Sequence, residues 1–103
     1  MQVQINPTKT GFVIYPYDSA PVRCPIAVYR HGSQETPVAS VRFTHCSKCG
    51  NSDDFHASPK QIGELASALE VAADLAQAMQ DHPDMTPNQI AAKVGVMLLF
   101  VRK

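Results

Sequence analysis

The chain has 103 residues, of which 45% are hydrophobic and 17% are charged. These proportions exclude a disordered chain and suit one domain with a self-supporting core, since single cores usually occupy about 100 to 150 residues. Nine basic residues balance nine acidic ones, which excludes the strong overall positive potential that normally accompanies nucleic-acid binding.

The charges are nevertheless distributed unevenly. Residues 1–49 carry five basic and two acidic side chains, a net charge of +3, and residues 50–103 carry four basic and seven acidic ones, a net charge of −3. The first half of the chain is therefore mildly basic and the second half mildly acidic.

The N-terminus lacks the basic and apolar regions of a secretory signal, and the longest apolar run, 94–101, is far shorter than the roughly 20 residues that span a bilayer. We therefore expect a cytoplasmic protein with no membrane contact. An odd number of cysteines in a reducing compartment favours metal binding or reduced thiols over a disulfide framework.

Four strands are predicted in the first 43 residues. Val3 and Ile5 alternate with polar residues until Pro7, and similar alternation continues over residues 12–17, 22–31 and 38–43. Pro25 suggests that the third strand is an edge strand or contains a bulge. Short connections between the strands favour an antiparallel meander.

Strand alternation divides this predicted sheet into two faces. The apolar face, which another element must cover, contains Phe12, Ile14, Val22, Ile26, Val28, Val41 and Phe43. The opposite face contains Tyr15, Tyr17, Arg23, Tyr29, His31, Ser40 and Arg42. Tyrosine and arginine are enriched at protein interfaces and also stack on single-stranded nucleic acid, so this face is a candidate partner-binding surface. The alternative is a solvated face on which tyrosines pack across strands.

Two capping boxes predict two helices. Ser58-Pro-Lys-Gln61 begins a helix that ends near Asp81, before Pro83, and Thr86-Pro-Asn-Gln89 begins another at Pro87. On the first helix, one apolar stripe is expected to cover the sheet and its flank to make a second contact. The stripe consists of Ile62, Leu65, Ala66, Leu69, Ala72, Ala73 and Ala76, and the flank of Val71, Leu75 and Met79. Residues 94–101 are expected to continue the second helix, to break at Gly95 into another short helix, or to form a strand.

The predicted fold class is therefore α+β. A small antiparallel meander of about four strands is covered on one face by a long helix, with a short C-terminal helical element beside it. We expect residues 1–103 to form one domain, with a β-sheet half (1–45), a Cys/His loop (46–57) and a helical half (58–103).

The loop contains a candidate structural zinc site. Cys46-Ser-Lys-Cys49-Gly50 has the form of a zinc knuckle, in which two thiolates reach one ion. A tetrahedral site needs two more ligands, and His56 and His45 are the nearest candidates. The alternative is a polar loop with reduced thiols and no cofactor. A thioredoxin-like role is disfavoured because about nine residues separate Cys49 from the helix cap.

The C-terminal stretch resembles a helix-turn-helix in the spacing of Ala91, Gly95 and Val101. The positions that would face a DNA groove are Met97, Leu98 and Leu99, which cannot hydrogen-bond to base edges. The chain also ends at Lys103, before a recognition helix is complete. The resemblance thus implies at most a degenerate helix-turn-helix at 86–103.

The sequence contains no paired nucleophile and base, no phosphate-cradling glycine loop and no paired-carboxylate site, so we do not expect an enzyme. We expect a small non-catalytic protein-binding or regulatory module, by analogy with phage-type or accessory inhibitor proteins. Its partner would be another protein, or a second copy that pairs through the apolar C-terminal segment. The alternative is a nucleic-acid-binding transcriptional regulator that uses the degenerate helix-turn-helix.

Overall fold

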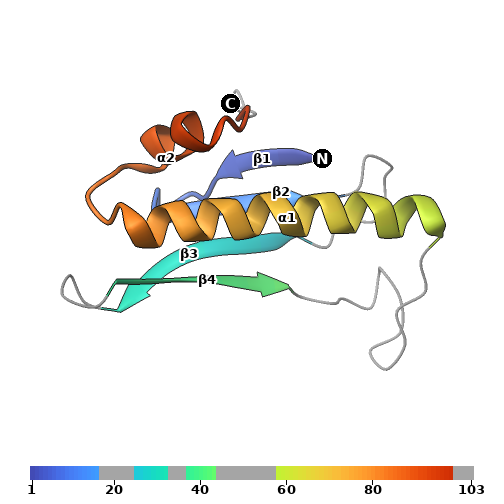
Figure 1. Ribbon diagram of the computed structural model, residues 1–103, viewed down its shortest axis with the longest axis horizontal. Coiled ribbons are helices and arrows are strands. Elements are labelled where there is room, and N and C mark those ends of the chain that lie inside the picture. Colours follow the sequence, from blue (N-terminus) through green and yellow to red (C-terminus); the bar gives the residue numbers. More distant parts are fainter. Residues whose placement is uncertain (17–24, 33–36, 44–57, 99–103) are drawn as a thin grey trace.

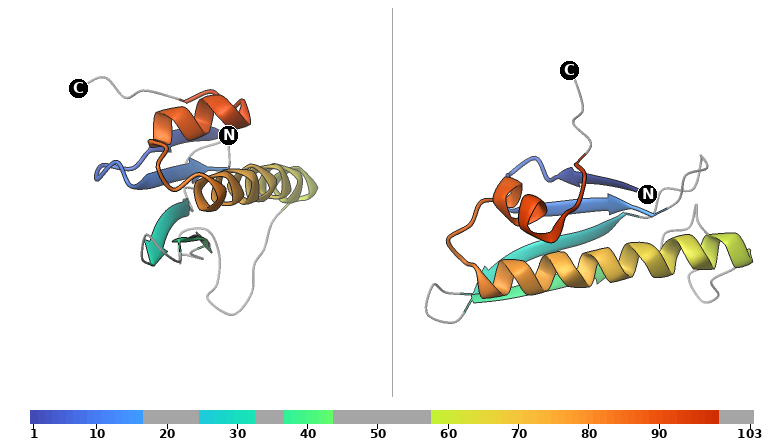
Figure 2. Two further views of the ribbon diagram at one scale, coloured as in Figure 1. Left: turned by 60° about the vertical axis from the view of Figure 1, so that its left-hand side comes forward. Right: turned by 45° about the horizontal axis from the view of Figure 1, so that its top comes forward.

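The computed structural model describes residues 1–16, 25–32, 37–43 and 58–98 (Figure 1). The strands β1 (Gln2–Ile5), β2 (Gly11–Tyr15), β3 (Ile26–Gly32) and β4 (Pro37–Phe43) form one antiparallel sheet in chain order. The helices α1 (Pro59–Asp81) and α2 (Pro87–Val94) follow. The long helix α1 lies along one face of the sheet, where it contacts β2, β3 and β4, and α2 packs beside it (Figures 1 and 2). The predicted α+β meander with a covering helix is confirmed.

The strand register aligns the apolar side chains in rows. Phe12 is paired with Ile5 and Val28, and Ile14 is paired with Val3 and Ile26. The side chains of Val3, Phe12, Ile14, Ile26 and Val28 are buried on the face that α1 covers. Because partners across an antiparallel ladder share a face, the alternation in the sequence is sufficient to predict this part of the core.

Pro25 has a different role from the predicted one. It immediately precedes β3, which is a central strand between β2 and β4. The expectation of an edge strand was wrong, because a proline outside the ladder removes none of its N–H donors. Residues 22–24, which a bulge at Pro25 would involve, lie outside the described residues.

The buried face of α1 is rotated from the predicted stripe. Its buried residues are Ala68, Ala72, Leu75 and Met79, at helical spacings of four, three and four residues. Leu75 and Met79 had been placed on the flank, whereas Ile62 and Leu69 from the predicted stripe are 48% and 39% exposed. The apolar arc of α1 is wider than the sheet contact, so periodicity alone did not locate its centre.

The short helix α2 ends where the sequence supplies a glycine. Gly95 adopts a left-handed conformation, with φ of 86°, and its N–H donates to the carbonyl of Ala91 at 2.9 Å. Residues 96–98 are neither helix nor strand. Ile90 and Ala91 are buried, and Val94, Val96 and Leu98 pack against the core. Residues 94–101 were expected to continue the helix, to break at Gly95 into another short helix, or to form a strand. The break at Gly95 is observed, but residues 96–98 form neither a further helix nor a strand, and residues 99–101 lie outside the described residues.

Arg30 connects the sheet to the junction between the helices. Strand alternation places it on the same face as Ile26 and Val28, toward α1. Its Nη2 donates to the carbonyls of Met79 and His82 at 3.3 Å and to that of Met85 at 3.4 Å. A cation thus lies where α1 leaves carbonyl groups without helical partners, which also complements the negative end of the helix dipole. This role of Arg30 was not predicted from the sequence.

Both predicted capping boxes are present, and they provide a direct test. The Ser58 hydroxyl accepts from the Gln61 N–H at 3.2 Å, and the Gln61 side chain accepts from the Ser58 N–H at 2.9 Å. We expect Ser58→Ala to lower the free energy of unfolding by about 1 kcal/mol, because alanine has no hydroxyl to accept from the Gln61 N–H at the start of the helix. Urea denaturation measures the loss. Ser67→Ala, at an exposed position inside α1, is the matched control and should be neutral or stabilising; an equal loss in both variants would contradict the capping role.

Candidate protein-binding face

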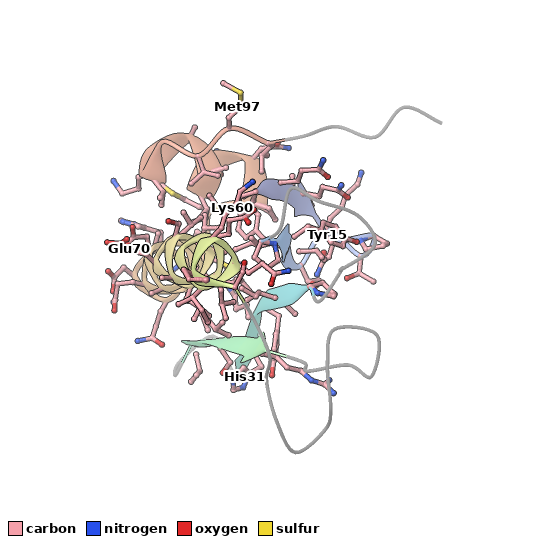
Figure 3. The ribbon with its side chains drawn as sticks, turned by 90° about the vertical axis from the view of Figure 1, so that its right-hand side faces the viewer. Tyr15, His31, Lys60, Glu70 and Met97 are labelled. Carbon is pink, nitrogen blue, oxygen red and sulfur yellow. The ribbon has the colours of Figure 1, made fainter. Side chains whose placement is uncertain are left out.

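The sheet face opposite α1, which we call the outer face, is covered by no helix of the described chain. Both helices lie on the other side of the sheet (Figure 2). Viewed along α1, Tyr15 extends from the sheet away from the helix, and Glu70 extends from the far side of α1 (Figure 3). Alternation and register assign ten side chains to the outer face: Gln2, Gln4, Val13, Tyr15, Ala27, Tyr29, His31, Val38, Ser40 and Arg42.

Three of these side chains form a cluster at one end of β3 and β4, which we call the Tyr29 cluster. The rings of Tyr29 and His31 have centroids 5.6 Å apart and are tilted by 37°. His31 Nε2 and Ser40 Oγ are 2.5 Å apart and share a hydrogen bond, and Ser40 lies directly opposite Tyr29 in the ladder. The hydrogen bond fixes the imidazole beside the phenol ring, so the cluster presents aromatic surface in a defined orientation.

Arg42 and Tyr15 extend the face away from this cluster. Arg42 is exposed and lies opposite Ala27, two residues along β4 from Ser40, which corresponds to about 7 Å on the same face. Tyr15 is half-buried and lies opposite Gln2 of β1. Among the described residues, the outer face carries a guanidinium, phenol and imidazole rings, amides and hydroxyls, but no carboxylate. Its described chemistry is therefore neutral to basic, with aromatic surface.

The predicted partner-binding residues divide into two groups. The structure places Tyr15, Tyr29, His31 and Arg42 on the outer face, as alternation indicated. Tyr17 and Arg23 lie outside the described residues. The binding role of all six stays a prediction.

Five side chains of this face were absent from the predicted list: Gln2, Gln4, Val13, Ala27 and Val38. Gln2 and Gln4 lie beside Tyr15 and Val13 because β1 pairs with β2, and Val38 is 38% exposed opposite His31. The alternation within each strand contains the signal for all five.

The candidate zinc ligands Cys46, Cys49, His56 and His45 all belong to the segment 44–57, which lies outside the described residues. The zinc site therefore stays a prediction. In residues 1–16, 25–32, 37–43 and 58–98, no group of three or more His, Cys, Asp or Glu side chains is arranged to hold a metal ion.

The C-terminal stretch has features that bear on the helix-turn-helix resemblance. Ala91 is buried against the core and Gly95 ends α2 with a left-handed turn. Met97 is 90% exposed and points away from α2 (Figure 3). Since residues 96–98 are not helical, the described part of the chain contains no second helix of a helix-turn-helix. Leu99 and Val101 lie outside the described residues.

Over the described parts of the chain, neither helix has the length and apolar character needed to cross a membrane. The helix α1 is long enough in residues but carries Glu64, Glu70, Asp74 and Asp81 along its length. No protein-family model, curated protein or solved structure matches this chain.

Proposed function

We propose that the protein is a non-catalytic binding module whose outer face holds an acidic segment of a partner protein. The observation that carries the proposal is the Tyr29 cluster, an ordered aromatic group on a sheet face that no described helix covers. Tyrosine supplies a large contact area at low entropic cost, because only two side-chain torsions must be fixed.

The charge of the outer face supports a partner that carries carboxylates. Arg42 is exposed near the cluster, and arginine binds a carboxylate through two parallel hydrogen bonds. The described face offers no carboxylate that would compete for this guanidinium. An acidic peptide beside Arg42 and the Tyr29 cluster thus gains a charge-assisted contact and aromatic packing together.

Protein is favoured over nucleic acid as the partner. Binding to a phosphate backbone draws its affinity from several neutralised phosphates, and hence from several cations on one surface. In the described residues the outer face offers one arginine and one histidine. A transcriptional regulator acting through residues 86–103 would need a recognition helix, and residues 96–98 do not begin one.

Selection from a random peptide display library tests the proposal. We expect enrichment of peptides rich in Asp and Glu, and the variant Tyr29→Ala/Arg42→Ala should bind them at least about tenfold more weakly, since hot-spot truncations cost more than about 1 kcal/mol each. The matched control is Glu70→Ala/Asp74→Ala, which alters exposed residues on α1 and leaves the outer face intact.

Three results would contradict the proposal. The enriched peptides could lack acidic residues, or the outer-face variant could bind them as well as the unaltered protein. Tight, salt-dependent binding of oligo-dT, abolished by the same variant, would instead assign the outer face to single-stranded nucleic acid.

A further inference from the structure

His31 is the titratable ring of the Tyr29 cluster, and it is exposed to solvent. Imidazole is the side chain whose charge ordinarily changes between pH 5 and 8. Arg42 is the one permanent cation among the described side chains of the outer face. A proton on His31 therefore doubles the positive charge that this described face presents, and it does so within the aromatic cluster.

The hydrogen bond to Ser40 is compatible with both charge states of the ring. A hydroxyl donates to an unprotonated ring nitrogen and accepts from a protonated one, so the pairing of His31 Nε2 with Ser40 Oγ needs no rearrangement when the ring gains a proton. The Tyr29 ring, 5.6 Å from the imidazole between centroids, lies within the distance at which aromatic rings attract a cation. Protonation thus changes the charge of the cluster and preserves its arrangement.

No carboxylate faces His31 from the described parts of β3 and β4. On the same face, β3 contributes Tyr29, and β4 contributes Val38 directly opposite, Ser40 on the diagonal and Arg42 two residues beyond Ser40. Of these neighbours only Arg42 carries a charge, because phenols are uncharged between pH 5 and 8.

The strand β2 adds no acidic group on the other side of β3. It begins at Gly11, opposite Tyr29, and the turn before it carries an exposed cation, Lys9. The described carboxylates belong to α1 and the turn that follows it, on the α1 side of the sheet (Figure 2). A protonated His31 thus lacks a counter-ion in the described part of the protein, and its Nδ1 has no hydrogen-bond partner there.

We infer that the outer face binds its acidic segment together with a proton on His31, so that the affinity rises as the pH falls from 8 to 5.5. This coupling rests on the proposed function, because the partner supplies the missing carboxylate. In the protonated ring both nitrogens are donors: Nε2 donates to Ser40, and Nδ1 is left to donate a charge-assisted bond to the partner. Linkage is reciprocal, so a carboxylate that favours the protonated ring is itself bound more tightly by that ring. The partner segment thus carries two carboxylates, one for Arg42 and one for His31.

Binding of an acidic peptide from the display selection at pH 8 and at pH 5.5, at constant ionic strength, tests the inference. Aspartate and glutamate side chains remain ionised over this range, so the charge of the peptide is nearly constant. We expect about threefold to fivefold tighter binding at pH 5.5, the effect of one added exposed ion pair. His31→Gln, which keeps a polar side chain but gains no proton, should bind the peptide equally well at both pH values. His82→Gln, which removes the histidine at the C-terminal end of α1, is the matched control and should keep the pH dependence.

Calorimetry in two buffers with different ionisation enthalpies measures the proton directly. Binding at about pH 6.5 should take up a fraction of one proton in the unaltered protein and none in His31→Gln. Equal affinity of the unaltered protein at both pH values, or a pH dependence that survives in His31→Gln, would overturn the inference and leave the proposed function standing. Failure of every acidic peptide to bind at either pH would instead reject the proposed function, and the inference with it.

Discussion

Gly11→Ala is expected to lower the free energy of unfolding by about 3 kcal/mol. A Cβ atom at position 11 would lie 2.0 Å from the carbonyl oxygen of Val28 and 3.0 Å from the Cα of Tyr29. Both contacts are with the backbone of the central strand β3, so no side-chain rotation relieves them. Gly11 is thus required by the close approach of β2 to β3. Urea denaturation followed by circular dichroism measures the loss.

Gly63→Ala is the matched control for this prediction. A Cβ at position 63 meets nothing within 4 Å, and Gly63 lies inside α1 on its exposed side. The same methyl group should here raise stability by about 1 kcal/mol, because alanine favours the helix over glycine. Equal effects of the two substitutions would show that the approach of β2 to β3 imposes no such constraint.

Arg30→Met is expected to lower the free energy of unfolding by about 2 kcal/mol, the range for hydrogen bonds from a charged donor. The three acceptors at Met79, His82 and Met85 share the two hydrogens of one Nη2, so their contributions do not add fully. Within the described structure, the Nε atom of Arg30 is buried without a hydrogen-bond partner, which offsets part of the gain. Methionine retains the apolar stem, so the loss reports the hydrogen bonds.

The Arg30→Met substitution should also affect one part of the protein, the turn between α1 and α2, more than the rest. Amide protection in α2 should decrease in Arg30→Met, because Arg30 holds the turn between α1 and α2. Arg42→Met is the control: Arg42 is exposed on the outer face, and its loss should change stability by less than about 0.5 kcal/mol. A stability loss without any change in α2 protection would mean that the hydrogen bonds of Arg30 do not hold the turn between α1 and α2.

Local chemistry made much of the fold predictable. The capping boxes at Ser58 and Thr86 predicted the first residue of each helix, because each pairs a hydroxyl and an amide with main-chain groups three residues apart. Alternation predicted the buried side chains Phe12, Ile14, Ile26 and Val28, since the two faces of a strand are separated by a period of two.

Contacts between residues far apart in the sequence could not be predicted from such local patterns. The helix α1 contacts both the sheet and α2, and no pattern within α1 tells which part of its apolar arc meets which of them. The role of Arg30 depends on carbonyls 49 to 55 residues further along the chain.

In the candidate site, too, the sequence predicted which residues share a face but not which side chains contact one another. Alternation predicted that Tyr29, His31 and Arg42 share a face with Tyr15. It did not predict the contact between the Tyr29 and His31 rings, or the bond from His31 to Ser40, because these depend on side-chain torsions. The diagonal placement of His31 and Ser40 across β3 and β4 follows from the observed register.

The most direct test of the proposed function is an NMR titration of the ¹⁵N-labelled protein with an acidic peptide from the display selection. We predict that the perturbed signals belong to the outer face, with the largest shifts at Tyr29, His31, Ser40 and Arg42. Changes centred instead on α1, α2 or Gly95–Leu98, with the outer face unperturbed, would contradict the account.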